Sequence, residues 1–186
     1  MNWEAITAIA TLIAAAAFIL TVLVGARQLR ATNAQLDHLR MAMQLEGTLK
    51  IFEELAAPEF VDALRFVRTD LSERLQDQAF REELTRPGAA NPSAHKELIV
   101  LRQFEKIGTL VHHRLIDADT LYDFNCHEYI SAWANLRPAL TIMRQRTPSG
   151  FNFTEELCLG AWRWLVQRSP AETDVLGYLG DSMQPA

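Results

Sequence analysis

The feature that most constrains this chain is a long uncharged run close to its N-terminus. From Ala5 to Ala26 there is no Asp, Glu, Lys, Arg or His, and Glu4 and Arg27 bracket the run. As a helix rising about 1.5 Å per residue, the run spans roughly 33 Å, close to the roughly 30 Å hydrocarbon core of a bilayer. Backbone polar groups in lipid need internal partners. The sequence therefore predicts a transmembrane helix over residues 5–26.

Two other interpretations of the run fit less well. A cleaved signal peptide has a basic n-region and an apolar core of about 7–15 residues, whereas residues 1–4 contain no Lys or Arg. A buried core helix rarely lacks charge over more than about five turns. The polar side chains of the run are Thr7, Thr11 and Thr21, whose hydroxyls can bond to carbonyls of their own helix.

The orientation of the span follows from the distribution of basic residues. The flank before it, residues 1–4, has no Lys or Arg, whereas Arg27, Arg30 and Arg40 follow it. The positive-inside rule therefore predicts a short external N-terminus and a cytoplasmic domain. Cys126 and Cys158 would then lie in a reducing compartment, so we expect both to be thiols.

One face of the predicted span carries small residues at helical spacing: Thr7, Ala10, Ala14, Ala17, Thr21 and Gly25. Small side chains let two helix backbones approach closely in lipid, which favours a homodimer. The alternative is that an alanine-rich span shows such a stripe by chance. The sequence leaves both open.

The sequence pattern of residues 27–57 predicts a stalk helix that continues directly from the span. Leu29, Leu36 and Met43 repeat every seven residues, with Leu39 between them. This pattern suits a partner helix, either from a second copy or from the chain's own domain, although it covers fewer than three clean heptads. We expect the helix to bend or break at Gly47, or to end before the proline at position 58.

Residues 58–186 predict an all-α domain of about six helices, because apolar residues recur at helical spacing and no segment alternates as a half-buried strand does. Several positions mark the expected boundaries and contacts: Pro58 as a first helical residue, Asp77 as an N-cap, a loop over residues 86–93, Gly108 at a close helix approach, Asp117 or Asp119 as an N-cap, a kink or split at Pro138, and a capping box from Asn152 to Glu155.

The sequence offers no catalytic motif, no phosphate-binding glycine loop and no metal-ligand spacing. His113 and Asp117 are four residues apart, and Asp119, Asp123 and His127 also recur at four. We interpret them as a solvated face, because paired Glu-x-x-His motifs are missing. We therefore predict no enzyme activity, no cofactor and no metal. The net charge of −5 argues against nucleic acid as a partner.

A late cluster of tryptophan and arginine leaves one question open. It comprises Trp133, Arg137, Arg144, Arg146, Trp162, Arg163, Trp164 and Arg168. Arginine stacked on tryptophan could bind an anion or a nucleic acid. The alternative is that the tryptophans belong to the core and the arginines to exposed faces.

Three phrases together carry a resemblance: "MQLEGTLKIFEELAAPEF", "FEKIGTLVHHRLID" and "WANLRP". With the N-terminal span before them, they resemble a bacterial family known only as domain of unknown function 4760. The resemblance covers nearly the whole chain and implies a bacterial membrane protein with a cytoplasmic helical domain. It implies no activity, so no functional residue is transferred from it.

The leading hypothesis is a single-pass protein of the bacterial inner membrane whose helical domain acts as a tethered interaction or scaffold module. Its expected partners are membrane lipid, a second copy through the span and stalk, and a protein of unknown identity. The alternatives are a membrane-associated effector or sensor, for example in phage defence, and an enzyme whose site is assembled from distant helices.

Overall fold

The structure, a computed structural model, describes residues 3–86, 94–170 and 183. Within the first helix, the side chains of residues 4–6, 8, 10 and 13–16 lie outside the description. The described residues form seven α-helices and no strand, which confirms the all-α class. The chain divides into two compact units, Met1–Met43 and Gln44–Ala186.

The first helix, α1, runs without interruption over 53 residues, Trp3–Leu55, and so contributes to both units. Gly47 lies inside it, so the helix does not break there and ends just before the proline at position 58. No helix in the described part of the chain is both long and apolar enough to cross a membrane. Of the predicted span, these residues have side chains outside the description: Ala5, Ile6, Ala8, Ala10, Ile13, Ala14, Ala15 and Ala16.

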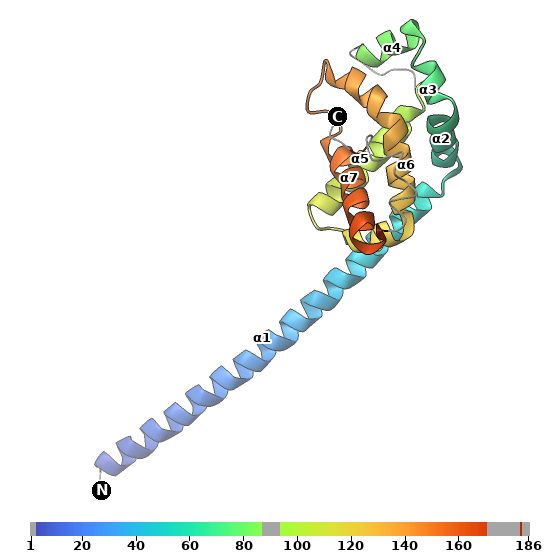
Figure 1. The fold of residues 1–186 in the computed structure, drawn as a ribbon. Coiled ribbons are helices and arrows are strands. Elements are labelled where there is room, and N and C mark those ends of the chain that lie inside the picture. Colours follow the sequence, from blue (N-terminus) through green and yellow to red (C-terminus); the bar gives the residue numbers. More distant parts are fainter. Residues whose placement is uncertain (1–2, 87–93, 171–182, 184–186) are drawn as a thin grey trace. The chain divides into compact units, whose positions relative to one another are not determined.

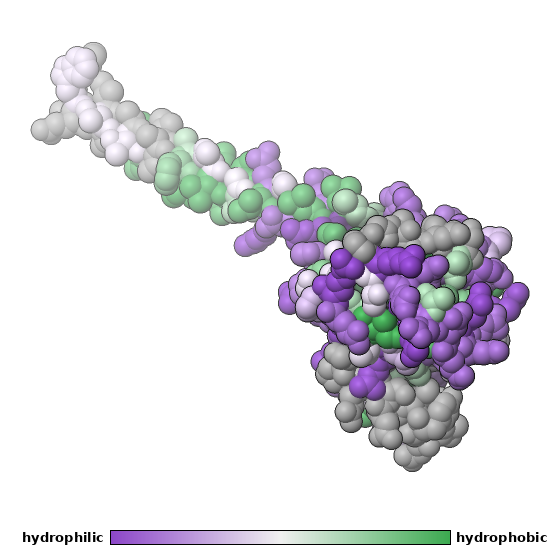
Figure 2. Space-filling model, turned by 90° about the horizontal axis from the view of Figure 1, so that it is seen from above, coloured by the Kyte–Doolittle hydropathy of each residue, from purple (hydrophilic) through white to green (hydrophobic). Residues whose placement is uncertain are grey.

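In the first unit, the described side chains of α1 are exposed. The hydroxyls of Thr7, Thr11 and Thr21 each donate to the carbonyl four residues earlier, at 2.8 Å, as the sequence predicts for threonine in an apolar helix. Apolar side chains gather along this helix in Figure 2. The heptad residues of the stalk are all exposed: Leu29, Leu36, Leu39 and Met43.

The second unit begins with the last turns of α1, where Thr48 and Ile51 are buried. Glu54 ties these turns to a neighbouring helix, because its carboxylate accepts from Lys106 Nζ at 2.6 Å and from Gln103 Nε2 at 2.7 Å. These two hydrogen bonds lower the pKa of Glu54. Residues 44–55, which the sequence pattern assigned to the stalk, thus pack with the domain.

Six further helices complete the second unit (Figure 1): α2 (Pro58–Thr69), α3 (Leu71–Arg74), α4 (Gln78–Thr85), α5 (Glu97–His112), α6 (Ala118–Arg144) and α7 (Asn152–Arg168). Pro58 is the first residue of α2, as predicted. The carboxylate of Asp77 accepts from the Ala79 amide and caps α4, and that of Asp117 accepts from the Thr120 amide and caps α6. Asp117 is thus the cap of the two candidates. Hydrogen bonds from the hydroxyl and the amide of Thr120 lower the pKa of Asp117.

The core lies where α5, α6 and α7 meet. Phe104 of α5 packs edge-on against Tyr129 of α6, and Trp133 one turn further along α6 is fully buried. Pro138 lies inside α6 without splitting it, which excludes the split that the sequence left open. Cys126 and Cys158 are buried thiols, as expected for small apolar residues.

The capping box expected from Asn152 to Glu155 is wrong. The residue before α7 is Phe151, in the left-handed conformation, and its side chain provides no cap. A carboxylate from α5 replaces the box, because Glu105 Oε2 accepts from the amide of Thr154 at 2.7 Å and from its hydroxyl at 2.9 Å. The local pattern failed because a residue distant in sequence satisfies the helix terminus.

Candidate functional site

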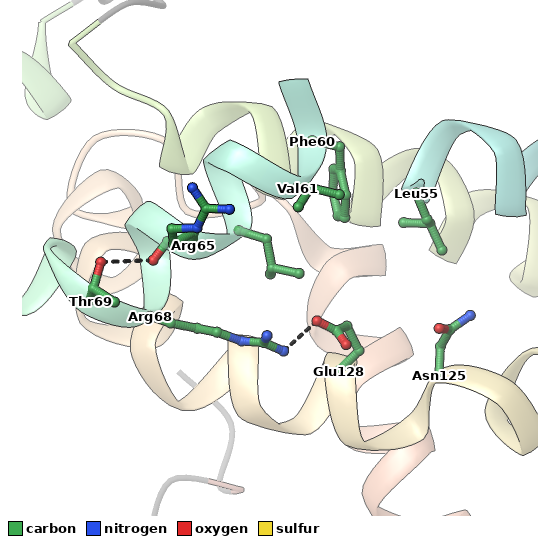
Figure 3. A pocket seen from close by; sticks show the side chains of 9 residues that line it. Leu55, Phe60, Val61, Arg65, Arg68, Thr69, Asn125 and Glu128 are labelled. Atoms are coloured by element: carbon green, nitrogen blue, oxygen red, sulfur yellow. Dashed lines mark hydrogen bonds and ion pairs between the residues drawn. The ribbon is translucent and has the colours of Figure 1, made fainter. Parts of the chain in front are cut away.

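A pocket of about 360 Å³ opens between α2 and α6 beside the end of α1. Figure 3 shows its walls, to which α2 contributes most of the side chains. We name it the α2–α6 pocket, and it is lined by Leu55, Phe60, Val61, Leu64, Arg65, Arg68, Thr69, Asn125 and Glu128. Its volume is at the lower end of the range of small-ligand binding pockets.

The amphipathic pattern of α2 builds the floor and the rim. Phe60 and Leu64 are four residues apart and point inward, where each is buried to more than 90%. Val61 follows Phe60 by one position, and Arg65 follows Leu64. Val61 and Arg65 therefore lie about 100° further round the helix and reach the opening. Val61 remains 42% exposed, so the pocket combines an apolar floor with a solvent-facing edge.

The two guanidinium groups of the rim differ in how they are held. Arg68 bonds to the carboxylate of Glu128 (Figure 3). It also donates to Ser131 Oγ at 3.2 Å, so Arg68 links α2 to α6. Arg65 lies 3.9 Å from Asp62 and its side chain is 70% exposed. Lys96 also binds Asp62. Arg65 is therefore the rim cation with the most freedom to meet an incoming anionic group.

An exposed aromatic side chain lies on α6 next to the pocket residue Asn125. Phe124 is 72% exposed and contacts Phe52 of α1 edge-on, with ring centroids 5.2 Å apart. Among the described residues that line the pocket there is no histidine or cysteine, the commonest bases and nucleophiles. The arrangement suits binding of an apolar group with a negative charge close by.

The residues predicted for the packing face of the span lie on α1. Ala17, Thr21 and Gly25 are exposed, as is Thr7, whereas the side chains of Ala10 and Ala14 lie outside the description. Arg27, Arg30 and Arg40 are exposed on the same helix. Arg40 lies 3.8 Å from Asp37.

The predicted acid and histidine residues are all exposed, as expected for a solvated face: His113, Asp117, Asp119, Asp123 and His127. Asp117 caps the helix, and Asp123 pairs with Arg168 at 2.9 Å. His112, one residue before the predicted pair, lies 3.1 Å from Glu156. In residues 3–86, 94–170 and 183, no three His, Cys, Asp or Glu side chains are placed to hold a metal ion.

The late tryptophan and arginine cluster is dispersed over the second unit. Trp133 is fully buried, and Arg168 stacks on Trp164 at 4.8 Å while it pairs with Asp123. Arg144 and Arg146 instead line a separate cavity with residues of α4. The alternative of core tryptophans and surface arginines thus describes Trp133, which is buried, and Arg146 and Arg168, which are exposed. Arg144 departs from it, because its side chain is largely buried and pairs with Glu155.

A family model described as domain of unknown function (DUF4760) matches residues 5–164, which is most of the 186-residue chain. The chain belongs to this family. The comparison with curated proteins and the comparison with solved structures gave no match. The DUF4760 match includes every residue of the α2–α6 pocket, so the pocket is part of the family's domain.

Sequence reasoning missed a cluster of titratable side chains around a buried histidine in this DUF4760 domain. His95 is fully buried and bridges two carboxylates: Nδ1 lies 2.7 Å from Glu97 and Nε2 lies 2.8 Å from Glu83. Phe80 stacks on the imidazole at 4.4 Å. Burial raises the pKa of Glu97, although the hydrogen bond from His95 opposes the shift. The only sequence signal is the His-x-Glu spacing just before α5, which many surface segments share.

Proposed function

We propose that this chain is a single-pass protein of the bacterial inner membrane and that its helical domain is a non-enzymatic interaction module. In this proposal residues 5–26 span the membrane, residues 1–4 lie outside, and the domain lies in the cytoplasm. The observation that carries the interaction role is the α2–α6 pocket, whose apolar floor and guanidinium rim offer two complementary kinds of contact.

The proposed anchor rests on the amino-acid sequence. The strong inserters are Ile6, Ile9, Leu12, Ile13, Phe18, Ile19, Leu20, Val22, Leu23 and Val24. At about −0.3 to −0.6 kcal/mol each near the bilayer centre, they favour insertion by about 3 to 6 kcal/mol. The span residues whose side chains lie outside the description are alanines and isoleucines, which continue the apolar run.

The exposure of the described apolar side chains supports the same proposal. Leu12 is 73% exposed, Phe18 71% and Leu20 64%. Contiguous exposed apolar surface of this kind marks a site that another molecule or a membrane covers. Lipid as the covering phase accounts for both the length of the run and its lack of charge.

Self-association is part of the proposal. The small residues of the span would let two copies pack in lipid, and the heptad leucines would continue the contact in water. Replacing Ala17 and Thr21 with Leu should lower the yield of crosslinked dimer in membranes. An unchanged yield would rule out the dimer.

The proposed occupant of the α2–α6 pocket is an apolar side chain of a partner protein, with an acidic neighbour that meets Arg65. A membrane tether raises the effective concentration of the domain for partners at the same surface. A pocket of this size can therefore bind a partner at the membrane surface even where the contact itself is weak.

Site-specific photo-crosslinking in intact cells tests this docking role. A photo-reactive amino acid in place of Val61, at the pocket edge, should give an adduct of discrete mass. A second variant with R65E should lose that adduct while the protein stays folded. Val166 of α7 is the matched control, because it is 40% exposed against 42% for Val61. Equal adducts from both positions, or an adduct that R65E leaves unchanged, would contradict docking at this pocket.

A further inference from the structure

A second cavity, of about 280 Å³, lies between the end of α4, the end of α6 and the start of α7. We name it the α4–α7 cavity. Leu84 and Leu140 form apolar parts of its wall, and both are buried. Three arginines also line it, Arg86, Arg144 and Arg146, and no Asp or Glu is among the described residues of its lining. The three arginines of this lining contrast with the net charge of −5 of the chain.

Arg144 is held rigidly at this cavity. Its Nε donates to the carbonyl of Gly150 at 3.1 Å and its Nη2 donates to Asn152 Oδ1 at 3.2 Å. Its Nη1 lies 2.6 Å from Glu155, and both side chains are more than 80% buried. Arg144 is therefore neutralised by Glu155 and acts as a fixed part of the wall.

Arg146 and Arg86 differ from Arg144 in their hydrogen-bond partners. Arg146 Nη1 donates to the carbonyl of Thr85 at 2.8 Å, which directs its guanidinium along the end of α4. Within the part of the chain that the structure describes, neither arginine pairs with a carboxylate. Two cations at one cavity, with no acidic partner among the described residues, create a local positive potential, which attracts anions.

Phe151 gives an independent reason to regard the cavity as built for a ligand. Its φ is 58° and its ψ is 40°, the left-handed conformation that residues with a Cβ rarely adopt. Such backbone strain in a non-glycine residue is concentrated at functional sites, including ligand clamps. Here the strained residue joins the lining that contains the guanidiniums.

We propose that the α4–α7 cavity binds a phosphate monoester attached to an apolar group. The guanidinium forks of Arg86 and Arg146 fit phosphate oxygens, which a planar fork binds through paired hydrogen bonds. The leucine wall and the ring of Phe151 contact the apolar part. The site is distinct from the anchor and from the α2–α6 pocket, because the described residues of its lining lie between positions 84 and 151.

Isothermal titration calorimetry on the full chain in phosphatidylcholine nanodiscs tests the proposal with hexyl phosphate as the probe. Hexyl phosphate should bind more tightly than inorganic phosphate, which lacks the apolar part, and more tightly than hexanoate, which lacks the phosphate. R146Q and R86Q should each weaken binding about 10-fold, the effect of one lost charged hydrogen bond. R163Q is the control, because Arg163 lies on α7 away from the cavity and should leave affinity unchanged.

A second arm distinguishes a lipid headgroup from a soluble ligand. Nanodiscs that contain phosphatidic acid should compete with hexyl phosphate if the headgroup reaches the cavity, and should not compete if the natural ligand is soluble. Either result keeps the site. No binding of hexyl phosphate at millimolar concentration, equal affinity for hexanoate, or full affinity in both R146Q and R86Q would overturn the proposal.

Discussion

Gly108 of α5 lies against the backbone of Phe153 in the first turn of α7, so that a Cβ added at Gly108 would stand 2.1 Å from the Phe153 carbonyl oxygen. The sequence predicted a close helix approach at this glycine, and the structure confirms it. Because a carbonyl cannot move without shifting the helix, we expect G108A to lower the free energy of unfolding by about 3 kcal/mol or more. Urea unfolding in detergent, followed by tryptophan fluorescence, measures this loss.

Gly160 supplies the matched control for that substitution. A Cβ there would lie 2.4 Å from the hydroxyl of Tyr122, the far end of a side chain that can turn aside. We expect G160A to cost clearly less than G108A. Equal losses from the two variants would mean that the α5–α7 contact is not limited by the backbone.

Gly47 leads to the opposite prediction. It lies inside α1, and a Cβ there would meet only Ile116, at an ordinary contact distance of 3.6 Å. Alanine is the better helix former by roughly 0.5 to 1 kcal/mol. We expect G47A to raise the midpoint of urea unfolding by a corresponding amount. A lower midpoint would show that α1 bends at this residue in solution.

The cap of α7 depends on Glu105. Because its carboxylate accepts from both the amide and the hydroxyl of Thr154, we expect E105A to cost about 2 kcal/mol of unfolding free energy. E105Q keeps an accepting oxygen and should retain most of the stability. Urea midpoints of the two variants against the parent provide the measurement. If E105Q is as unstable as E105A, packing rather than the hydrogen bond explains the loss.

The buried cluster at His95 predicts a pH dependence. The ordinary pKa of Glu97 is 4.5, its value in the unfolded chain, and burial raises it in the folded protein. The proton that the folded state retains contributes stability that is complete below pH 4.5 and is lost as pH rises through the raised pKa. Between Glu97 and His95 Nδ1, one proton satisfies the short contact.

E97Q isolates this contribution. The variant cannot lose a proton, so the difference in unfolding free energy between E97Q and the parent should move in favour of E97Q as pH rises above 4.5. Carboxyls with lowered pKa, such as Glu54 and Asp117, act in the opposite direction, but they cancel in the comparison. A constant difference from acid to neutral pH would contradict the proposed linkage.

Much of the fold could be predicted because residues close together in the sequence determine where the helices begin. Pro58, Asp77 and Asp117 mark helix starts through the chemistry of the first turn, which depends on few neighbours. Helical periodicity gave the all-α class and the buried face that contains Trp133. The failures concern partners distant in sequence: Glu105 replaces the capping box at Asn152, and residues 44–55 of α1 pack with the domain.

The candidate sites could not be predicted for the same reason. The α2–α6 pocket needs Leu55, Val61 and Glu128 together, and no spacing in the sequence brings three helices to one point. His95 and Glu83 are 12 residues apart, and no helical spacing in the sequence predicts the hydrogen bond between them. Arg144 and Arg146 were recognised as part of a basic cluster, but only their neighbours on α4 make that cluster a cavity.

The most direct test of the central claim is alkaline carbonate extraction of membranes from cells that express the full chain. Carbonate strips proteins held by surface charge and leaves lipid-embedded helices in the pellet. The anchor at residues 5–26 predicts that the full chain stays in the pellet and that a variant without residues 1–26 moves to the supernatant. Release of the intact chain by carbonate would contradict the membrane span and the tethered role built on it.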